Sequence, residues 1–495
     1  MKKILKITSV MGVATLIKIF AGLIRAKFLA WQLGPIGIGL AGQAQMFSVF
    51  AVQLCSLNIA MGVTKGVSER LAKNDRASLP LVTDSANTFQ FIAAMLFIVA
   101  VLPFTVPLTK FVFADAKYWP YFVGIALTTP FAVYLLGMAT PIFYAFGKIA
   151  DYTKLTILYT AVGLAILVVS VYFFGLDGIF VQIITLGLLS FLFSLYFLRK
   201  RLSFVPGYNF SLLRGREARA ASVELFKYSV MSFLPGNVTM LVMLFIRGLF
   251  LKQYGIEANG FFQVAYALSA YYLPFVTNAL WGHFYPEMCA LGEKKDVNRS
   301  LNEFARFAIF ASTAIAALCI IFRRYMILIL FSSEFMKAYD LLAIQAIGDI
   351  FFVLFYMFNT SLIARKKFDG IIWIQTIGYN VALLGSYFVL RIIPFVDFRS
   401  FNIAIALTNI LFVVAQAAYF HLDTGFSFTK HNIRSLVLSL AVLALLLAIP
   451  DGDLLAFLIK IAVLLGWIFL SVTKEEIRSL FSFMAEFFKK DNVPA

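Results

Sequence analysis

The sequence has few charged residues and few cysteines. Only 14% of its 495 residues are charged, whereas 61% are hydrophobic and fifty-five are Phe. A water-soluble fold cannot bury that much apolar surface, so the composition excludes a soluble protein. The three cysteines, Cys55, Cys289 and Cys319, are scattered and exclude a disulfide framework. The composition therefore predicts an integral membrane protein.

Several catalytic patterns are also missing. The sequence contains no phosphate-binding loop, no nucleophile elbow, no metal-ligand cluster and no pair of carboxylates in a soluble segment. The predicted outer loops are short, as in Gly175–Gly178 and Pro450–Asp453, and leave no room for a catalytic domain outside the membrane. We therefore expect a protein that is not an enzyme and that holds no cofactor and no metal ion.

Apolar stretches recur from one end of the chain to the other. Each has about twenty residues, enough to cross a hydrocarbon core of about 30 Å as a helix. The basic N-terminal segment lacks a small-residue cleavage site, so we interpret it as a retained first span rather than a signal peptide. The pattern predicts an all-α polytopic membrane protein with about fourteen transmembrane helices. The expected spans are 8–33, 37–66, 85–112, 119–146, 155–174, 179–198, 228–253, 259–291, 303–322, 338–364, 369–391, 401–421, 434–449 and 454–472.

The formal net charge of +17 follows the membrane and does not indicate a nucleic-acid partner. With the N-terminus inside, most Lys and Arg fall at cytoplasmic ends or in cytoplasmic loops, which is the positive-inside pattern. Both termini are therefore expected in the cytoplasm. The longest soluble piece, 199–224, is basic, and it is expected either to touch anionic lipid heads or to dock a partner.

The second half of the chain repeats features of the first at an offset of about 221 residues. Gly34 and Gly39 correspond to Gly255 and Gly260, and further pairs follow in the same order. An even number of helices in each repeat predicts two lobes of the same topology, related by a pseudo-twofold axis along the membrane normal. The predicted parts are an N-lobe over 1–198, a basic inter-lobe loop over 199–227, a C-lobe over 228–421, an extra helix pair over 422–472 and a cytoplasmic tail over 473–495.

Four cations lie inside predicted spans, namely Lys18, Arg25, Lys27 and Arg247. A charge in hydrocarbon is costly, so such residues are expected to face a protein interior or a watery cavity. Lys18 and Arg25 share a helix face, and Arg25 and Arg247 lie at one depth in the two repeats. Arginine binds phosphate oxygens bidentately, which predicts a cationic cavity for a diphosphate or another doubly anionic group. The alternative is that these side chains snorkel to the membrane surface.

Asp349 is the notable acidic residue within a span. Gln345 lies one turn before it, and Asn359 lies further along a similar face. A lone carboxylate at this depth predicts either coupling to H⁺ or Na⁺ or an ion pair with a basic residue across an interface.

Asn278, His283 and Glu287 end the eighth span near the cytoplasmic surface. His283 and Glu287 are four residues apart and share a face, as half of a metal site would. The other histidines, His421 and His431, lie in a distant loop, so we expect a gate or an interface hydrogen bond there rather than a metal.

Two N-terminal segments, Ile17–Gln45 and Gly62–Glu69, resemble the amino-terminal region of the Wzx-type flippases of lipid-linked oligosaccharides. The matching positions are Lys18, Gly34, Pro35, Gly37, Gly39, Gly62, Thr64 and Lys65. The resemblance implies two six-helix lobes around a central cavity in the bacterial inner membrane. It also implies that a polyprenyl-diphosphate oligosaccharide, such as an O-antigen or enterobacterial common antigen unit, moves from the cytoplasmic to the periplasmic leaflet. The family's basic cavity residues carry over onto Lys18, Arg25 and Lys65.

Three alternatives stay open at this point. Fourteen spans, rather than the twelve of many Wzx-type proteins, suit a lipid II flippase. A multidrug and toxin exporter would need a cavity rich in carboxylates and aromatics, whereas the intramembrane charge here is positive. A membrane polymerase or ligase acting on the same lipid would expose a large outer loop. Polysaccharide polymerase or assembly proteins are possible partners, and monomer is the default oligomeric state.

Overall fold

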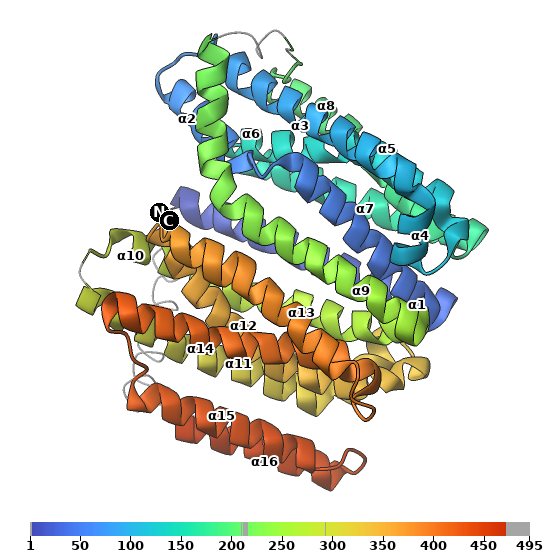
Figure 1. The fold of residues 1–495 in the computed structure, drawn as a ribbon, viewed down its shortest axis with the longest axis vertical. Helices are drawn as coiled ribbons and strands as arrows, with labels where there is room; N and C mark the ends of the chain where they lie inside the picture. Colours follow the sequence, from blue (N-terminus) through green and yellow to red (C-terminus); the bar gives the residue numbers. More distant parts are fainter. Residues whose placement is uncertain (1, 209, 211–215, 293, 472–495) are drawn as a thin grey trace, which may run out of the picture. The chain divides into compact units, whose positions relative to one another are not determined.

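The computed structural model describes residues 2–208, 210, 216–292 and 294–471, and the regular secondary structure in that part of the chain is all helical (Figure 1). The predicted tail, 473–495, lies outside the described residues. The α-helices are α1 Lys2–Ser56, α2 Ala60–Ala72, α3 Leu79–Val101, α4 Thr105–Phe113, α5 Trp119–Tyr134, α6 Thr140–Ala145, α7 Ile149–Phe174, α8 Asp177–Leu202, α9 Arg216–Ala279, α10 Tyr285–Ala290, α11 Lys294–Leu330, α12 Tyr339–Ala364, α13 Tyr379–Leu390, α14 Ser400–Thr424, α15 Lys430–Ala448 and α16 Leu454–Ser471. Short 3-10 or π segments are η1 Leu102–Phe104, η2 Ala116–Tyr118, η3 Leu135–Ala139, η5 Leu280–Phe284, η6 Ser333–Ala338, η7 Gly370–Gly378 and η8 Asp397–Arg399.

The helices account for the expected spans. Within the described residues, 12 helical stretches are long and apolar enough to cross a membrane. Two of these, Thr15–Ser56 and Phe233–Ala290, each overlap two of the predicted spans. The predicted span 37–66 is too long, because its helix ends at Ser56 and α2 begins only at Ala60. The fourteen expected spans are thus accommodated, and the prediction of an all-α polytopic membrane protein is confirmed.

Both long helices are kinked at glycine. In α1, Gly34 has φ 62°, and in α9, Gly255 has φ 81°. These left-handed values suit glycine, because a side chain there would clash with the following carbonyl. Each glycine stands between two of the predicted spans, at corresponding positions of the repeat. The kinks therefore separate each long helix into two membrane-crossing segments.

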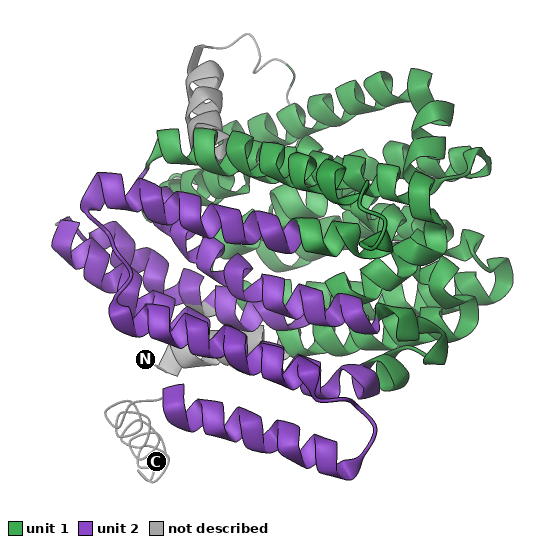
Figure 2. Cartoon of the chain, turned by 60° about the horizontal axis from the view of Figure 1, so that its bottom comes forward, with its two compact units in different colours: residues 1–267, 327–338, 367–404 green, residues 268–326, 339–366, 405–495 purple. Residues whose placement is uncertain are grey.

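The chain forms two compact units (Figure 2). Residues 1–267, 327–338 and 367–404 make unit 1, and residues 268–326, 339–366 and 405–495 make unit 2. The predicted lobe boundaries, at 198 and 228, stay a prediction.

Each unit has an apolar core. One core of unit 1 packs α2, α3, α6, α7 and α8 together through side chains such as Val67, Ile142 and Leu155. A core of unit 2 joins α11, α12, α15 and α16 through side chains such as Ile320 and Trp467. The extra helix pair α15–α16 is therefore packed on α11 and α12.

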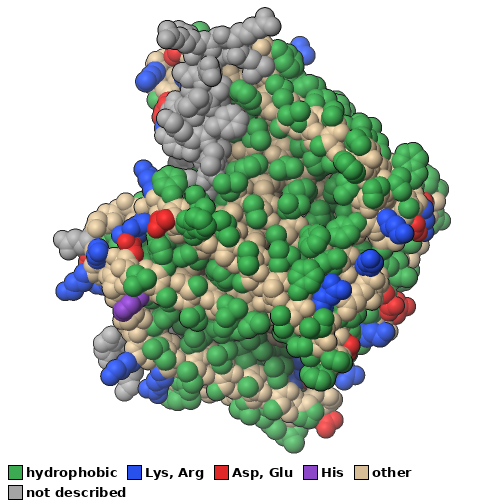
Figure 3. Space-filling view, viewed as in Figure 1, with side chains coloured by type: hydrophobic (Ala, Val, Ile, Leu, Met, Phe, Trp, Pro, Cys, Tyr) green, Lys and Arg blue, Asp and Glu red, His purple; other side chains and the backbone are tan. Residues whose placement is uncertain are grey.

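Large apolar side chains also cover the surface. Trp31 is 77% exposed and Phe395 is 81% exposed. Figure 3 shows hydrophobic side chains over most of the visible face, with Lys, Arg, Asp and Glu gathered toward its two sides. A soluble protein rarely shows so large an apolar area, whereas a bilayer covers it.

The start of the predicted inter-lobe loop is hydrogen-bonded to α3. The backbone N–H of Gly207 donates to Asp84 Oδ1 over 2.8 Å, and Asn87 Nδ2 donates to the carbonyl oxygen of Gly207 over 2.9 Å. Residues 209 and 211–215 of this loop lie outside the described part.

Candidate functional site

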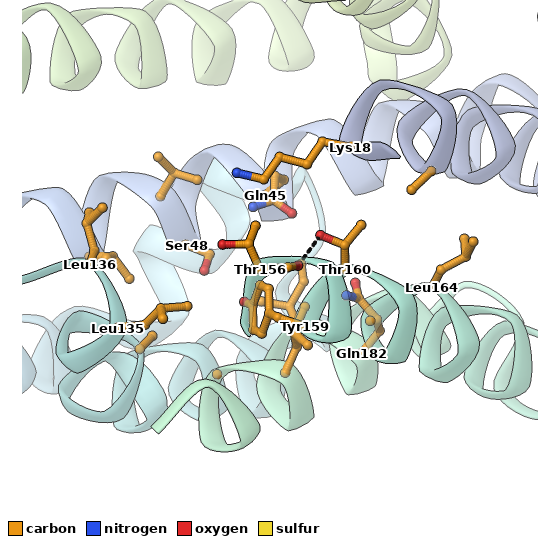
Figure 4. Close-up of a pocket in the computed structure, with 18 of the residues that line it drawn as sticks. Lys18, Gln45, Ser48, Leu135, Leu136, Thr156, Tyr159, Thr160, Leu164 and Gln182 are labelled. Carbon is orange, nitrogen blue, oxygen red and sulfur yellow. Dashed lines mark hydrogen bonds between the residues drawn. The ribbon is translucent and has the colours of Figure 1, made fainter. Parts of the chain in front are cut away.

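Unit 1 contains a pocket of about 660 Å³ between α1, α5, η3, α7 and α8. Segments of α1 on both sides of its kink contribute to the wall of the pocket. Apolar side chains such as Leu136 and Leu164 line part of the pocket (Figure 4). Its polar lining residues are Lys18, Arg25, Gln45, Ser48, Gln53, Thr140, Tyr152, Thr156, Tyr159, Thr160 and Gln182.

One side of the pocket is cationic. Lys18 and Arg25 both reach it from the first segment of α1, so the shared face predicted from their spacing is what lines the cavity. Lys18 is exposed, and Arg25 is half-buried and donates from Nη1 to Gln45 Oε1 over 3.3 Å. No Asp or Glu is among the described residues that line the pocket. Two cations without a carboxylate in a cavity of low dielectric favour an anionic ligand.

The opposite wall is neutral and polar. Figure 4 shows Lys18 and Gln45 on α1, with Thr156, Tyr159 and Thr160 of α7 across the pocket. Thr160 Oγ1 donates to the backbone carbonyl of Thr156 over 2.8 Å. The pocket therefore joins a cationic side to a side built from hydroxyl and amide groups.

Arg247 lies elsewhere in unit 1 and does not line this pocket. It is 2% exposed, and its guanidinium donates to Asn259 Oδ1 over 3.2 and 3.0 Å and to Gln263 Oε1 over 2.8 Å. The ring of Phe262 lies 5.1 Å from its guanidinium carbon. Since Gly255 separates Arg247 from these partners, the arginine links the two segments of α9 across the kink.

Arg25 and Arg247 make similar contacts across the two kinks but do not occupy equivalent positions in the repeat. Arg25 reaches Gln45 across the kink at Gly34, just as Arg247 reaches Asn259 across the kink in α9. Yet Arg25 corresponds to Ile246 in the repeat, one residue away from Arg247, and one residue turns a helix by about 100°. Only the first arginine therefore borders the pocket. That they face one common cleft stays a prediction.

The other predicted cations have protein partners and do not line the pocket. Lys27 Nζ donates to the carbonyl oxygen of Phe331 over 2.6 Å, at the C-terminal end of α11, where a cation complements unpaired carbonyls. Lys65 pairs with Glu69 over 3.5 Å on the exposed face of α2. Their roles in substrate binding stay predictions.

Asp349 lies in unit 2 and is 3% exposed. Ser269 Oγ donates to its Oδ2 over 2.6 Å, the hydroxyl of Tyr272 donates to the same oxygen, and Gln345 Nε2 donates to Oδ1 over 2.9 Å. The predicted proximity of Gln345 and Asp349 is thus present. All three partners are neutral, and within the described region no basic residue forms an ion pair with this carboxyl group.

The remaining predicted residues lie apart from the pocket. Asn278, His283 and Glu287 are exposed in and around η5, and their role as a gate stays a prediction. No group of three possible metal ligands occurs in the described part of the chain. Asn359 is not joined to Asp349 but accepts a hydrogen bond from Gln416 of α14.

Sequence reasoning missed Gln182 of α8. This residue is 3% exposed and lines the pocket. The available signal is a glutamine within a predicted span, but no charged residue lies within one helical turn of it to mark it as functional. The missed residue matters because it sits on the neutral wall.

The chain is 24% identical over 380 residues to the lipid III flippases of Escherichia coli (strain K12) and Shigella flexneri, a match that covers 76% of this chain and 89% of each relative. No family model matches the chain.

Two solved structures show the likeness of the fold. One is an inward-facing multidrug resistance MATE family transporter of the MOP superfamily, with a TM-score of 0.63 and 13% identity over 83% of this chain and 94% of that chain. The other is the lipid II flippase MurJ in an inward closed conformation, with a TM-score of 0.61 and 15% identity over 96% of this chain and 100% of that chain. The chain therefore shares the fold of these two transporters. The predicted resemblance to flippases of lipid-linked oligosaccharides is confirmed by the match to the lipid III flippases.

Proposed function

We propose that this protein is a flippase for a polyprenyl-diphosphate oligosaccharide, which it moves from the cytoplasmic to the periplasmic leaflet by alternating access. The observation that carries the proposal is the pocket of unit 1, where Lys18 and Arg25 face a cavity without a lining carboxylate. The named activity of the relatives, lipid III flippase, supports it.

The two cations suit a diphosphate. Lys18 and Arg25 are seven residues apart on one helix, which places them about 10 Å apart along its axis at 1.5 Å per residue. Both side chains are long, so their charged ends can converge on one group. A diphosphate diester carries two negative charges and only acceptor oxygens, and both cations are donors. The prenyl tail would stay in lipid while the head crosses.

A lipid II flippase is the second candidate, because its substrate also carries a polyprenyl diphosphate. The helix pair α15–α16, which completes the fourteen spans, favours it. A multidrug-type exporter of cationic compounds is disfavoured, since two cations in the pocket would repel such a substrate.

We also propose that Asp349 takes up a proton during transport. A buried carboxylate without a cation is unfavourable when charged, and protonation removes that cost. Among the described residues its partners are neutral rather than cationic, which supports this role over the predicted ion pair. The three donors in turn stabilise the ionised form, so the proton can also be released. Na⁺ would instead require oxygen atoms whose lone pairs point at the ion.

The location, the orientation and the partners of the protein follow from the flippase proposal. We propose a multi-pass protein of the bacterial inner membrane with both termini in the cytoplasm, because most Lys and Arg then lie on that side. It acts as a transporter without a chemical step of its own. Polymerase or assembly proteins would take over the flipped lipid.

The test is complementation in bacteria that lack their own flippase for a surface polysaccharide. We expect the wild type to restore the polysaccharide, and Lys18→Ala combined with Arg25→Ala to insert normally but fail. Arg76→Ala is the matched control, since Arg76 is an exposed cation in the loop after α2. Restoration by the double variant would contradict the pocket assignment. Export of cationic dyes by the wild type without any polysaccharide would instead support the multidrug type.

A further inference from the structure

Gln182, at the wall of the pocket, carries an acceptor without a partner in the protein. Its side chain is 3% exposed, and Oε1 is buried with no hydrogen-bond partner in the protein. Leaving a buried polar atom unpaired costs about 1–3 kcal/mol, so such atoms usually have a partner. Because the residue lines the pocket, a bound ligand can supply the missing donor.

The neighbouring threonines also offer acceptors. Thr156 Oγ1 donates its hydrogen to the carbonyl oxygen of Tyr152 over 3.0 Å, and Thr160 Oγ1 donates to the carbonyl oxygen of Thr156 over 2.8 Å. A hydroxyl group has one donor and two lone pairs, so both oxygens keep lone pairs for a ligand. Figure 4 shows Gln182 close to Thr160 on this wall, across the pocket from Lys18.

The two sides of the pocket therefore suit different parts of a ligand. Lys18 and Arg25 are donors and match the oxygens of a diphosphate. The acceptors of the opposite wall match a ligand that carries donors, such as the hydroxyl and acetamido N–H groups of a sugar.

We propose that Gln182, with Thr156 and Thr160, forms a subsite that binds the sugar next to the diphosphate and contributes to glycan selectivity. This inference rests on the proposed flippase function and names the part of the pocket that recognises the glycan. A purely structural role would not make binding depend on the sugar.

The experiment measures binding of two short-chain probes to the full-length protein in lipid nanodiscs. The probes are the methyl ester and the N-acetylglucosaminyl ester of farnesyl diphosphate. Both are diphosphate diesters with two negative charges, and only the second has a sugar, which carries hydroxyl and amide donors. One or two added hydrogen bonds of about 1 kcal/mol each predict that the wild type binds the sugar-bearing probe about tenfold more tightly.

Gln182→Leu should abolish this preference and leave the affinity for the methyl ester within about twofold. Thr160→Val, which keeps the side-chain shape, should reduce the preference as a second variant. Gln32→Leu is the matched control, because Gln32 is an exposed glutamine of α1 outside the pocket, and it should change neither affinity.

The contrary outcomes are distinct. Equal affinity of the wild type for both probes, or an unchanged preference in Gln182→Leu, would overturn the sugar subsite and leave the flippase proposal intact. Equal weakening of both probes by Gln182→Leu would indicate a structural role and also overturn it. Failure of the wild type to bind either probe would count against the proposed function itself.

Discussion

Gly39 and Gly260 touch where the second segment of α1 crosses the second segment of α9. A methyl group on Gly39 would lie 2.3 Å from the carbonyl oxygen of Ile256, and one on Gly260 would lie 2.1 Å from that of Pro35. These two contacts are exchanged by the repeat, since each partner lies four residues before the opposite glycine. The crossing is therefore a local pseudo-twofold contact, and it requires glycine on both sides.

Gly39→Ala and Gly260→Ala should each destabilise the protein by about 1–3 kcal/mol, because the added methyl group must push the opposite backbone away. The change is measured as thermal unfolding of the purified protein in detergent. Gly385→Ala is the control, since Gly385 lies within α13 with no heavy atom near the added group. Unfolding of both crossing variants at the wild-type temperature would contradict the close contact.

Arg247→Met should lower stability, whereas Arg25→Met should not. Methionine at 247 leaves the fully buried acceptor of Asn259 without the arginine donors, at about 1–3 kcal/mol, and also removes the donor to the half-buried Gln263. Arg25 is half-buried and borders the pocket, so its loss should weaken farnesyl diphosphate binding and leave the unfolding temperature nearly unchanged. A lower unfolding temperature in Arg25→Met, together with weaker binding but unchanged stability in Arg247→Met, would contradict these roles.

Asp349→Asn should make transport independent of an imposed pH gradient, because asparagine imitates the protonated carboxyl group. The measurement is flux of a labelled lipid-linked oligosaccharide in proteoliposomes with and without the gradient. Asp340→Asn, an exposed change on the same helix, should respond as the wild type does. A pH-dependent flux in Asp349→Asn would rule out this residue as the coupling site.

Asp451 should make stability fall in acid. It lies in the α15–α16 loop, where burial raises its pKa, but hydrogen bonds from Lys460 and Tyr339 and the charges of Lys460 and Arg323 lower it overall. A carboxyl group with a lowered pKa stabilises the fold above its unfolded value of about 3.9, and the contribution is lost as the pH falls through the lowered value. Unfolding temperature is therefore expected to drop below about pH 4.

Asp451→Asn tests that expectation. It should lower the unfolding temperature at pH 7 and flatten the acid dependence, because the neutral amide no longer pairs with Lys460 and Arg323. Asp453→Asn changes an exposed neighbour in the same loop and should behave as the wild type. If the unfolding temperature of Asp451→Asn falls as steeply in acid as that of the wild type, other carboxylates cause the acid dependence.

Much of the fold could be predicted from the sequence, because hydrocarbon allows few choices. Apolar length alone predicts the spans, and the repeated glycines at 34 and 255 mark both kinks. The common face of Lys18 and Arg25 follows from helical periodicity and is the face that lines the pocket.

The rest depends on contacts between distant segments. Arg247 is enclosed by Asn259 and Gln263, whereas Arg25 borders a cavity. The repeat in the sequence does not predict this difference, because its offset is uncertain by one residue. The neutral surroundings of Asp349 come partly from Ser269 and Tyr272, eighty and seventy-seven residues earlier. No local pattern carries such information, because these pairings arise only when helices pack.

The most direct test of the central claim is flipping by the purified protein in liposomes. A fluorescent polyprenyl-diphosphate oligosaccharide is placed in both leaflets, and a membrane-impermeant quencher reports how much of it becomes accessible from outside. The account predicts rapid, nearly complete quenching with the wild type and quenching near that of protein-free liposomes with Lys18→Ala combined with Arg25→Ala. Rapid quenching by a correctly folded double variant would contradict the claim that these two cations carry the diphosphate.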